Sequence, residues 1–217
     1  EAVVPILLYY HVASNPSGSR FYVSPDDFRE QMQYLHDQDY TAITITDLIL
    51  VLYNGGELPA KPVLITFDGG NDNIHTNAFP IMQELGFVGV VYVVANRLQS
   101  EGFLNPGELS EMIDAGWQIG SQGFTHQDLT QAHGQVRLEL LQSRLDLESQ
   151  LGVRVTTFAY PFGQMDAFVA NKVEEYGYYS AVGLGESATH TWGTLYYLKR
   201  FEILGDVILD DFIQQLP

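Results

Sequence analysis

The sequence predicts an α/β fold with a barrel-like closure, formed by a single domain over residues 1–217. Apolar runs alternate with amphipathic segments along the whole chain, and short loops join them. A chain of 217 residues with 46% hydrophobic and 12% aromatic residues can bury one sizeable core. We find no linker, internal repeat or low-complexity tract, so a barrel-like closure is favoured over two domains.

Seven apolar runs are expected to form buried strands. They are Val4–Tyr10, Thr41–Ile45, Pro62–Phe67, Val88–Val94, Gln118–Gly120, Thr157–Ala159 and Ser180–Val182. Helical patterns lie between these runs, and this order is typical of a parallel sheet covered by helices.

Five segments are expected to form the helices. They are Ser24–Asp37, Asn77–Leu85, Asn105–Ala115, Gln135–Leu151 and Asp166–Tyr176. The first has Ser24 as the expected N-cap and Pro25 at the first helical position. The other four each end at a glycine, a residue that tolerates the positive φ common after a helix.

Composition limits the classes of partner and site. Ten Lys and Arg residues against 27 Asp and Glu residues give a formal charge of −17, which argues against a nucleic-acid partner. No Cys is present, so disulfides, thiolate zinc sites and Cys nucleophiles are excluded, and any metal site needs His and carboxylates. No apolar stretch approaches the ~20 residues of a membrane span.

The chain opens at Glu1 with neither Met nor a basic leader. We expect a secreted protein of the extracellular space or cell envelope, with its signal or anchor absent from this sequence.

In a β/α barrel, chemistry lies at the carboxyl ends of the strands. Asp68 follows the strand Pro62–Phe67 and enters a Gly-rich turn, and His126 follows the strand Gln118–Gly120. His11 ends the first strand. Each has a purely structural alternative, because a turn Asp often caps the local backbone and a lone His often belongs to the fold.

Several motifs occur together in order along the chain. They are Tyr10-His11, Thr66-Phe67-Asp68, Gly120-Ser121 leading to Thr125-His126, Tyr160-Pro161-Phe162-Gly163 and Lys199-Arg200. Together they resemble the polysaccharide deacetylase family, metal-dependent carbohydrate esterases that remove acetyl groups from glycans such as chitin, peptidoglycan and poly-N-acetylglucosamine. The resemblance covers nearly the whole chain and implies a distorted (β/α)7-8 barrel.

The resemblance also implies a degenerate metal site. It makes Asp68 the catalytic base and His126 a remnant metal ligand, whereas Gly69 and Gln122 occupy the other two ligand positions. Arg200 stands where the family places a His near the end of the domain. Catalytic zinc sites use three protein ligands, so we expect metal-dependent deacetylation to be impaired or lost.

Other site residues follow from the same resemblance. His11, Tyr160, Pro161 and Phe162 are expected to bind substrate, and the Phe162 N–H is expected to help stabilise an oxyanion. Aromatic side chains that could stack on sugar rings or belong to the core are Tyr9, Tyr10, Phe124, Tyr160, Phe162 and Trp192. We expect no cofactor, except zinc or another divalent metal if Asp68 and either Asp72 or His75 rebuild a site with His126.

Three hypotheses remain open at this point. The first is a pseudoenzyme that binds polysaccharide containing N-acetylglucosamine on a deacetylase fold. The second is an active carbohydrate deacetylase, a hydrolase of non-peptide C–N bonds, with a relocated metal or an unusual site. The third is an acidic structural domain of a larger surface protein.

Overall fold

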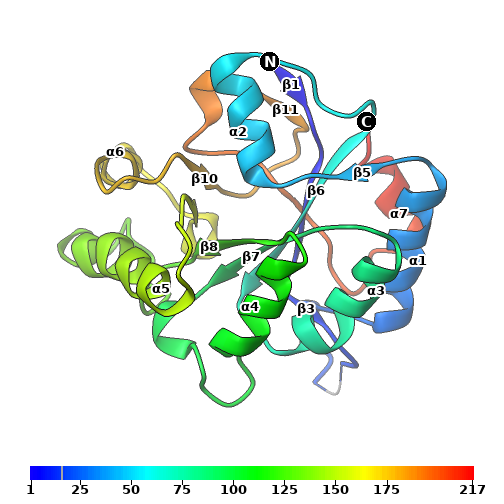
Figure 1. Cartoon of the computed structure of the whole chain (residues 1–217), viewed down its shortest axis with the longest axis horizontal. Coiled ribbons are helices and arrows are strands. Elements are labelled where there is room, and N and C mark those ends of the chain that lie inside the picture. Colours follow the sequence, from blue (N-terminus) through cyan, green and yellow to red (C-terminus); the bar gives the residue numbers. More distant parts are fainter. Residues whose placement is uncertain (16) are drawn as a thin grey trace.

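The computed structural model describes residues 1–15 and 17–217. Its centre is a curled parallel sheet in which strands follow one another in nearly the order of the sequence (Figure 1). The strands are β2 (Ile6–Tyr9), β6 (Pro62–Gly69), β7 (Val90–Val93), β8 (Gln118–Ser121), β9 (Thr157–Ala159), β10 (Ser180–Val182) and β12 (Phe201–Glu202), with β5 (Thr41–Ala42) paired to the start of β6. The predicted single-domain barrel-like fold is confirmed.

The last strand segment connects the two sides of the curled sheet. The Leu198 N–H donates to the Ala181 carbonyl, and the Gly183 N–H donates to the Leu198 carbonyl, so residue 198 pairs with β10. A few residues on, Phe201 pairs with Leu7 of β2. Residues 198–202 therefore lie between the first and last long strands, and Arg200 sits within this closing segment.

Helices cover the outer face of the sheet (Figure 1). They are α1 (Pro25–Asp37), α3 (Phe79–Glu84), α4 (Pro106–Asp114), α5 (Ser143–Leu151), α6 (Ala167–Glu175) and α7 (Leu209–Gln214). Two π-helical turns, Ile74–Ala78 and Arg137–Gln142, lead into α3 and α5. Short pairs of strands complete the fold: β1 (Ala2–Val3) with β11 (Thr189–His190), and β3 (His11–Val12) with β4 (Tyr22–Val23).

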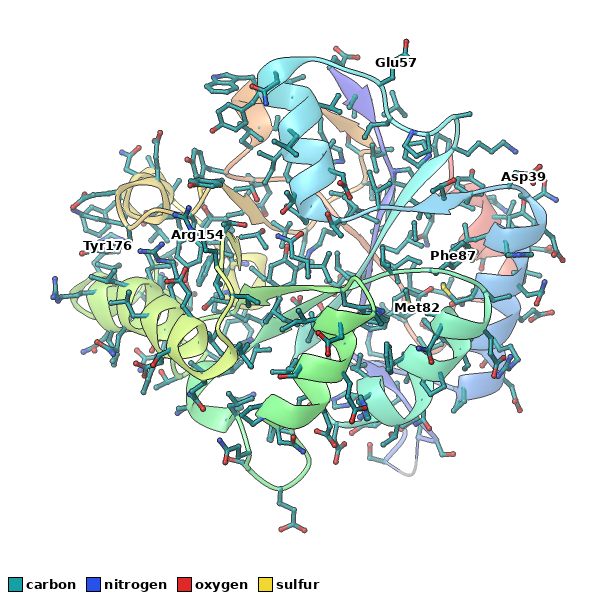
Figure 2. All side chains as sticks on the ribbon, in the orientation of Figure 1. Asp39, Glu57, Met82, Phe87, Arg154 and Tyr176 are labelled. Atoms are coloured by element: carbon teal, nitrogen blue, oxygen red, sulfur yellow. The ribbon has the colours of Figure 1, made fainter. Side chains whose placement is uncertain are left out.

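Alternation along β6 separates two cores. Val63, Ile65 and Phe67 join an outer core with the helices, to which Met82 and Phe87, labelled in Figure 2, also belong. The intervening residues point to the interior of the barrel. Leu64 contributes there to an inner core that also contains Ile6, Val90, Tyr92, Ala159, Val182 and Leu198. This alternation places Thr66 and Asp68 on the interior face.

One predicted strand is partly wrong. Thr41–Ile45 was expected to be a strand, but only Thr41–Ala42 is, and Ile45 begins the helix α2 (Ile45–Asn54). A capping box explains the change, because Thr44 accepts from the Asp47 N–H while the Asp47 carboxylate accepts from the Thr44 N–H. Ile45, Leu48 and Ile49 then pack against the inner core.

Gly120 on β8 marks a close approach inside the barrel. A Cβ at this position would lie 2.5 Å from the Tyr92 ring and 2.9 Å from Thr157 Cγ2. We therefore expect Gly120→Ala to lower the free energy of unfolding by about 1–3 kcal/mol, because the ring or the strand must move. Urea denaturation measures this.

Gly134→Ala is the matched control, since a Cβ there meets nothing within 4 Å. Its unfolding free energy should change by less than about 0.5 kcal/mol. Equal effects of the two substitutions would contradict the tight packing of Gly120 on Tyr92.

Candidate active site

Asp68 forms a buried ion pair with Arg200 at the mouth of the barrel. Arg200 Nη1 lies 2.7 Å from Asp68 Oδ1, and Nη2 lies 2.9 Å from Oδ2. Both residues are almost inaccessible, at 4% and 1% exposure. The pair is bidentate, the geometry in which Arg binds a carboxylate most strongly.

The guanidinium group is held on its other sides as well. Its Nε donates to the Gly183 carbonyl at 3.1 Å, its Nη1 also reaches Thr66 Oγ1 at 3.3 Å, and its Cζ lies 5.4 Å from the centre of the Tyr92 ring. Burial opposes the charge, but the attraction of Asp68 outweighs it and raises the pKa of Arg200. Arg200 is therefore a permanent cation beside Asp68.

Gln122 provides a third donor to the same carboxylate. It follows β8, is 2% exposed, and donates from Nε2 to Asp68 Oδ2 at 2.8 Å. The opposite amide orientation would place two oxygens against each other, so Asp68 fixes the orientation of Gln122. Within the described chain, Gln122 Oε1 is buried and has no hydrogen-bond partner.

These contacts engage most of the lone pairs of Asp68. Oδ2 accepts from Arg200 and Gln122, and Oδ1 accepts from Arg200. A carboxylate offers about four acceptor positions, two on each oxygen. One position on Oδ1 is left to face a ligand or water.

Gly69 occupies a conformation that side chains rarely adopt. Its φ is +97°, and a Cβ there would lie 2.9 Å from Asn71 Nδ2. The Asn71 amide is itself committed, since Nδ2 donates to the backbone carbonyls of Tyr10 and Asp68. A carboxylate-bearing residue at position 69 would therefore need both backbone and Asn71 to move.

His126 lies across the same cavity, on a loop held by a buried carboxylate. Glu139 is fully buried and accepts the N–H groups of Phe124 and Thr125 at 2.9 Å, and also the Thr125 hydroxyl. His126 lies on this loop, and its backbone φ is +68°. Burial, followed by the nearby positive Arg97, lowers the pKa of His126, so the imidazole is neutral at neutral pH.

His11 also lines the cavity. Its ring stacks on Tyr22 at 4.1 Å, and its Nδ1 lies 3.0 Å from Asn73 Nδ2. Because Asn73 Oδ1 accepts from the Val12 N–H, Asn73 Nδ2 is the donor to His11. Burial lowers the pKa of His11, and the neutral ring therefore carries its proton on Nε2.

The cavity between these groups has a volume of about 420 Å³. Its lining includes Tyr10, His11, Phe21, Asp68, Gly69, Asn71, Arg97, Gln122, His126, Phe162, Arg200 and Glu202. The sequence-predicted residues Asp68, His126, His11 and Phe162 thus meet at one site, together with Gly69 and Gln122.

Two predicted substrate-binding residues lie elsewhere. Tyr160 is 1% exposed and donates its hydroxyl to the Tyr196 carbonyl, and Pro161 is also buried. Neither side chain lines the cavity, whereas Phe162 is 60% exposed at its rim. Among the other aromatic candidates only Tyr10 lines it, because Tyr9 belongs to the outer core and Trp192 packs on Tyr53.

The donors of this site do not fit a catalytic zinc ion. Within residues 1–15 and 17–217, no three His, Asp or Glu side chains converge as a metal requires. Position 69 has no side chain, and Gln122 turns an amide N–H toward Asp68. The proposed substitute ligand His75 is bonded through Nε2 to Glu111 and, like Asp72, does not line the cavity.

Sequence reasoning missed three functional contacts. Arg200 was noted as a departure from the family pattern, but its pairing with Asp68, 132 residues earlier, was not foreseen. Glu139 and Glu202 were not singled out. If residues 200–202 had been assigned to a strand, the two-residue spacing of Arg200 and Glu202 would have indicated that both side chains face the cavity.

Comparison with known proteins identifies the class. The sequence profile described as polysaccharide deacetylase matches residues 55–181, which is more than half of the chain. The chain therefore belongs to the polysaccharide deacetylase family.

None of the described helices is long and apolar enough to cross a membrane.

Individual relatives agree with this family. Over 99% of this chain and 98% of the other, the fold matches the Streptococcus pyogenes deacetylase PplD in complex with acetate, with a TM-score of 0.91 and 25% identity. The Bacillus cereus polysaccharide deacetylase BC0361 has a TM-score of 0.85 and 28% identity, covering 99% of this chain and 69% of that one. A Staphylococcus aureus poly-beta-1,6-N-acetyl-D-glucosamine N-deacetylase is 23% identical over 91% of this chain and 73% of its own length.

A double-mutant cycle on Asp68 and Arg200 tests the ion pair. Arg200→Gln should lower the free energy of unfolding by about 3–5 kcal/mol, because it leaves a buried carboxylate without its cation. Adding Asp68→Asn should recover part of this loss, giving a coupling energy above about 1.5 kcal/mol. Urea denaturation of the four proteins measures it.

Arg29 and Glu84 form the control pair, at 2.6 Å but exposed on the surface. The same cycle there should give a much smaller coupling, because solvent screens the charges. Additive effects of Asp68→Asn and Arg200→Gln would contradict the buried pair.

Proposed function

We propose that this chain binds polysaccharide containing N-acetylglucosamine and has lost metal-dependent deacetylation. The observation that carries the proposal is the engagement of Asp68 by Arg200 and Gln122. In this proposal Asp68 is the former general base and His126 the one remaining ligand of the family's metal site.

Acetamide hydrolysis needs an activated water and a stabilised oxyanion. A zinc ion supplies both in metal hydrolases, because it lowers the pKa of its bound water to about 7. Here no donor is present at position 69, and Gln122 offers a neutral amide. Asp68 keeps one acceptor position on Oδ1, but among the residues that the structure describes no cluster of ligands could hold a metal to make the water acidic enough for rapid attack.

Binding does not need that chemistry. The cavity volume of about 420 Å³ lies within the usual range for ligand pockets, about 300–1,000 Å³. Aromatic rings of Tyr10, Phe21 and Phe162 line it, and such rings pack on the apolar faces of sugars. The Staphylococcus aureus relative, named for an N-deacetylase of poly-beta-1,6-N-acetyl-D-glucosamine, supports this glycan class.

A second candidate function is residual hydrolysis by an unusual site. It is favoured by one observation, the presence of Asp68 and His126 on the same cavity with an acceptor position left on Asp68 Oδ1. In both readings we place the protein outside the cell or in the cell envelope, where such glycans occur.

The test combines binding, metal content and turnover on the purified protein. N-acetylglucosamine oligomers should bind with a Kd below about 1 mM by calorimetry. Zinc should be well below one equivalent by elemental analysis, and acetate release should equal that of Asp68→Asn. Acetate release that disappears in Asp68→Asn would instead support the second candidate, and no binding would refute the proposal.

A pair of exposed aromatic residues provides the matched control. Phe162 and Trp192 are 60% and 59% exposed, but only Phe162 lines the cavity. Phe162→Ala should weaken binding by about 5–10-fold, because a stacking surface is lost. Trp192→Ala should leave the Kd unchanged, and equal effects of the two would place binding elsewhere.

A further inference from the structure

A carboxylate stands at the rim of the cavity, beyond the Asp68–Arg200 pair. Glu202 lies two residues after Arg200 on the closing segment, so both side chains face the mouth of the barrel. Glu202 Oε1 accepts the Tyr10 hydroxyl at 2.6 Å. Among the residues that the structure describes, the ion pairs do not include Glu202.

Aromatic rings flank this carboxylate. Tyr10 packs edge-to-face on Phe21 with ring centres 4.9 Å apart, and both residues line the cavity. Phe21 is 44% exposed, so one ring is open to a ligand. A carboxylate beside aromatic rings is the arrangement that proteins use to bind alkylammonium groups.

The four charged groups of the lining sum to zero, while the protein as a whole is strongly acidic. Asp68 and Arg200 neutralise each other, which leaves Glu202 and Arg97 as the remaining charged groups of the lining. Arg97 lies over the Phe103 ring at 5.4 Å and lowers the pKa of His126. Its guanidinium group can also donate to sugar hydroxyls. The formal charge of −17 attracts cationic polymers to the surface and repels acidic ones.

We propose that the cavity binds the free amino group of a de-N-acetylated hexosamine, with Glu202 as the counter-charge and Tyr10 and Phe21 as the flanking rings. This inference rests on the proposed glycan binding and specifies its ligand. The protein then recognises glycan whose acetyl groups have already been removed by a hydrolase, rather than removing them itself.

Calorimetry with two oligomers of equal length tests this. Glucosamine and N-acetylglucosamine tetramers are compared at pH ~6, where an alkylamine is protonated. The wild-type protein should bind the glucosamine tetramer at least ~10-fold more tightly. Glu202→Gln should abolish this preference by weakening the binding of the glucosamine tetramer, with the thermal midpoint confirming a folded variant.

Glu57→Gln is the control for charge alone. Glu57 lies on the exposed loop between α2 and β6, at the periphery of the molecule (Figure 2), and its substitution removes the same single charge. The preference should survive in this variant.

Three results would overturn the inference. Equal affinity of the wild-type protein for the two tetramers refutes amine recognition but leaves the proposed glycan binding in place. A preference that survives Glu202→Gln assigns it to the general negative field and refutes the role of Glu202. Failure of both tetramers to bind refutes this inference and the proposed function together.

Discussion

The buried ion pair between Asp68 and Arg200 is the interaction on which the rest of the site depends. Burying two charges is costly, and further hydrogen bonds to both partners offset part of that cost. Thr66 and the Gly183 carbonyl hold the guanidinium, and Gln122 holds the carboxylate. The pair also links β6 to the closing segment, 132 residues away, so the same contact that organises the cavity fastens the barrel.

The residues that depart from the family pattern are compatible with the Asp68–Arg200 pair and with one another. Gln122 offers an amide N–H, which suits a neighbouring carboxylate already bound to Arg200, and Gly69 permits the left-handed turn that brings Asn71 against the backbone. Restoring a single metal ligand would disrupt these contacts. Returning a side chain to position 69 would strain the backbone and crowd Asn71. We therefore interpret the site as an alternative, internally consistent arrangement rather than as a metal site that lacks two residues.

Much of the fold follows from the sequence, and less of the site does. Strands β9 and β10 were predicted at the residues where they occur, and Ser24 caps α1 as expected, because local patterns specify these features. The helix α2 was missed although Thr44 and Asp47 carry its capping signal. At the site, Asp68 and His126 were both predicted to follow a strand, and both line one cavity in the structure. The partners of Asp68 could not be predicted, because Arg200 approaches from a segment distant in sequence and no local pattern records that contact.

The central claim is that Arg200 and Gln122 hold the carboxylate of Asp68 and that no metal site forms between Asp68 and His126. Crystals grown with excess zinc and measured at its absorption edge test this most directly. The account predicts that Arg200 and Gln122 remain bonded to Asp68, with no anomalous peak between Asp68 and His126. A zinc ion bound there by Asp68 and His126, with Gln122 or Arg200 displaced, would contradict it.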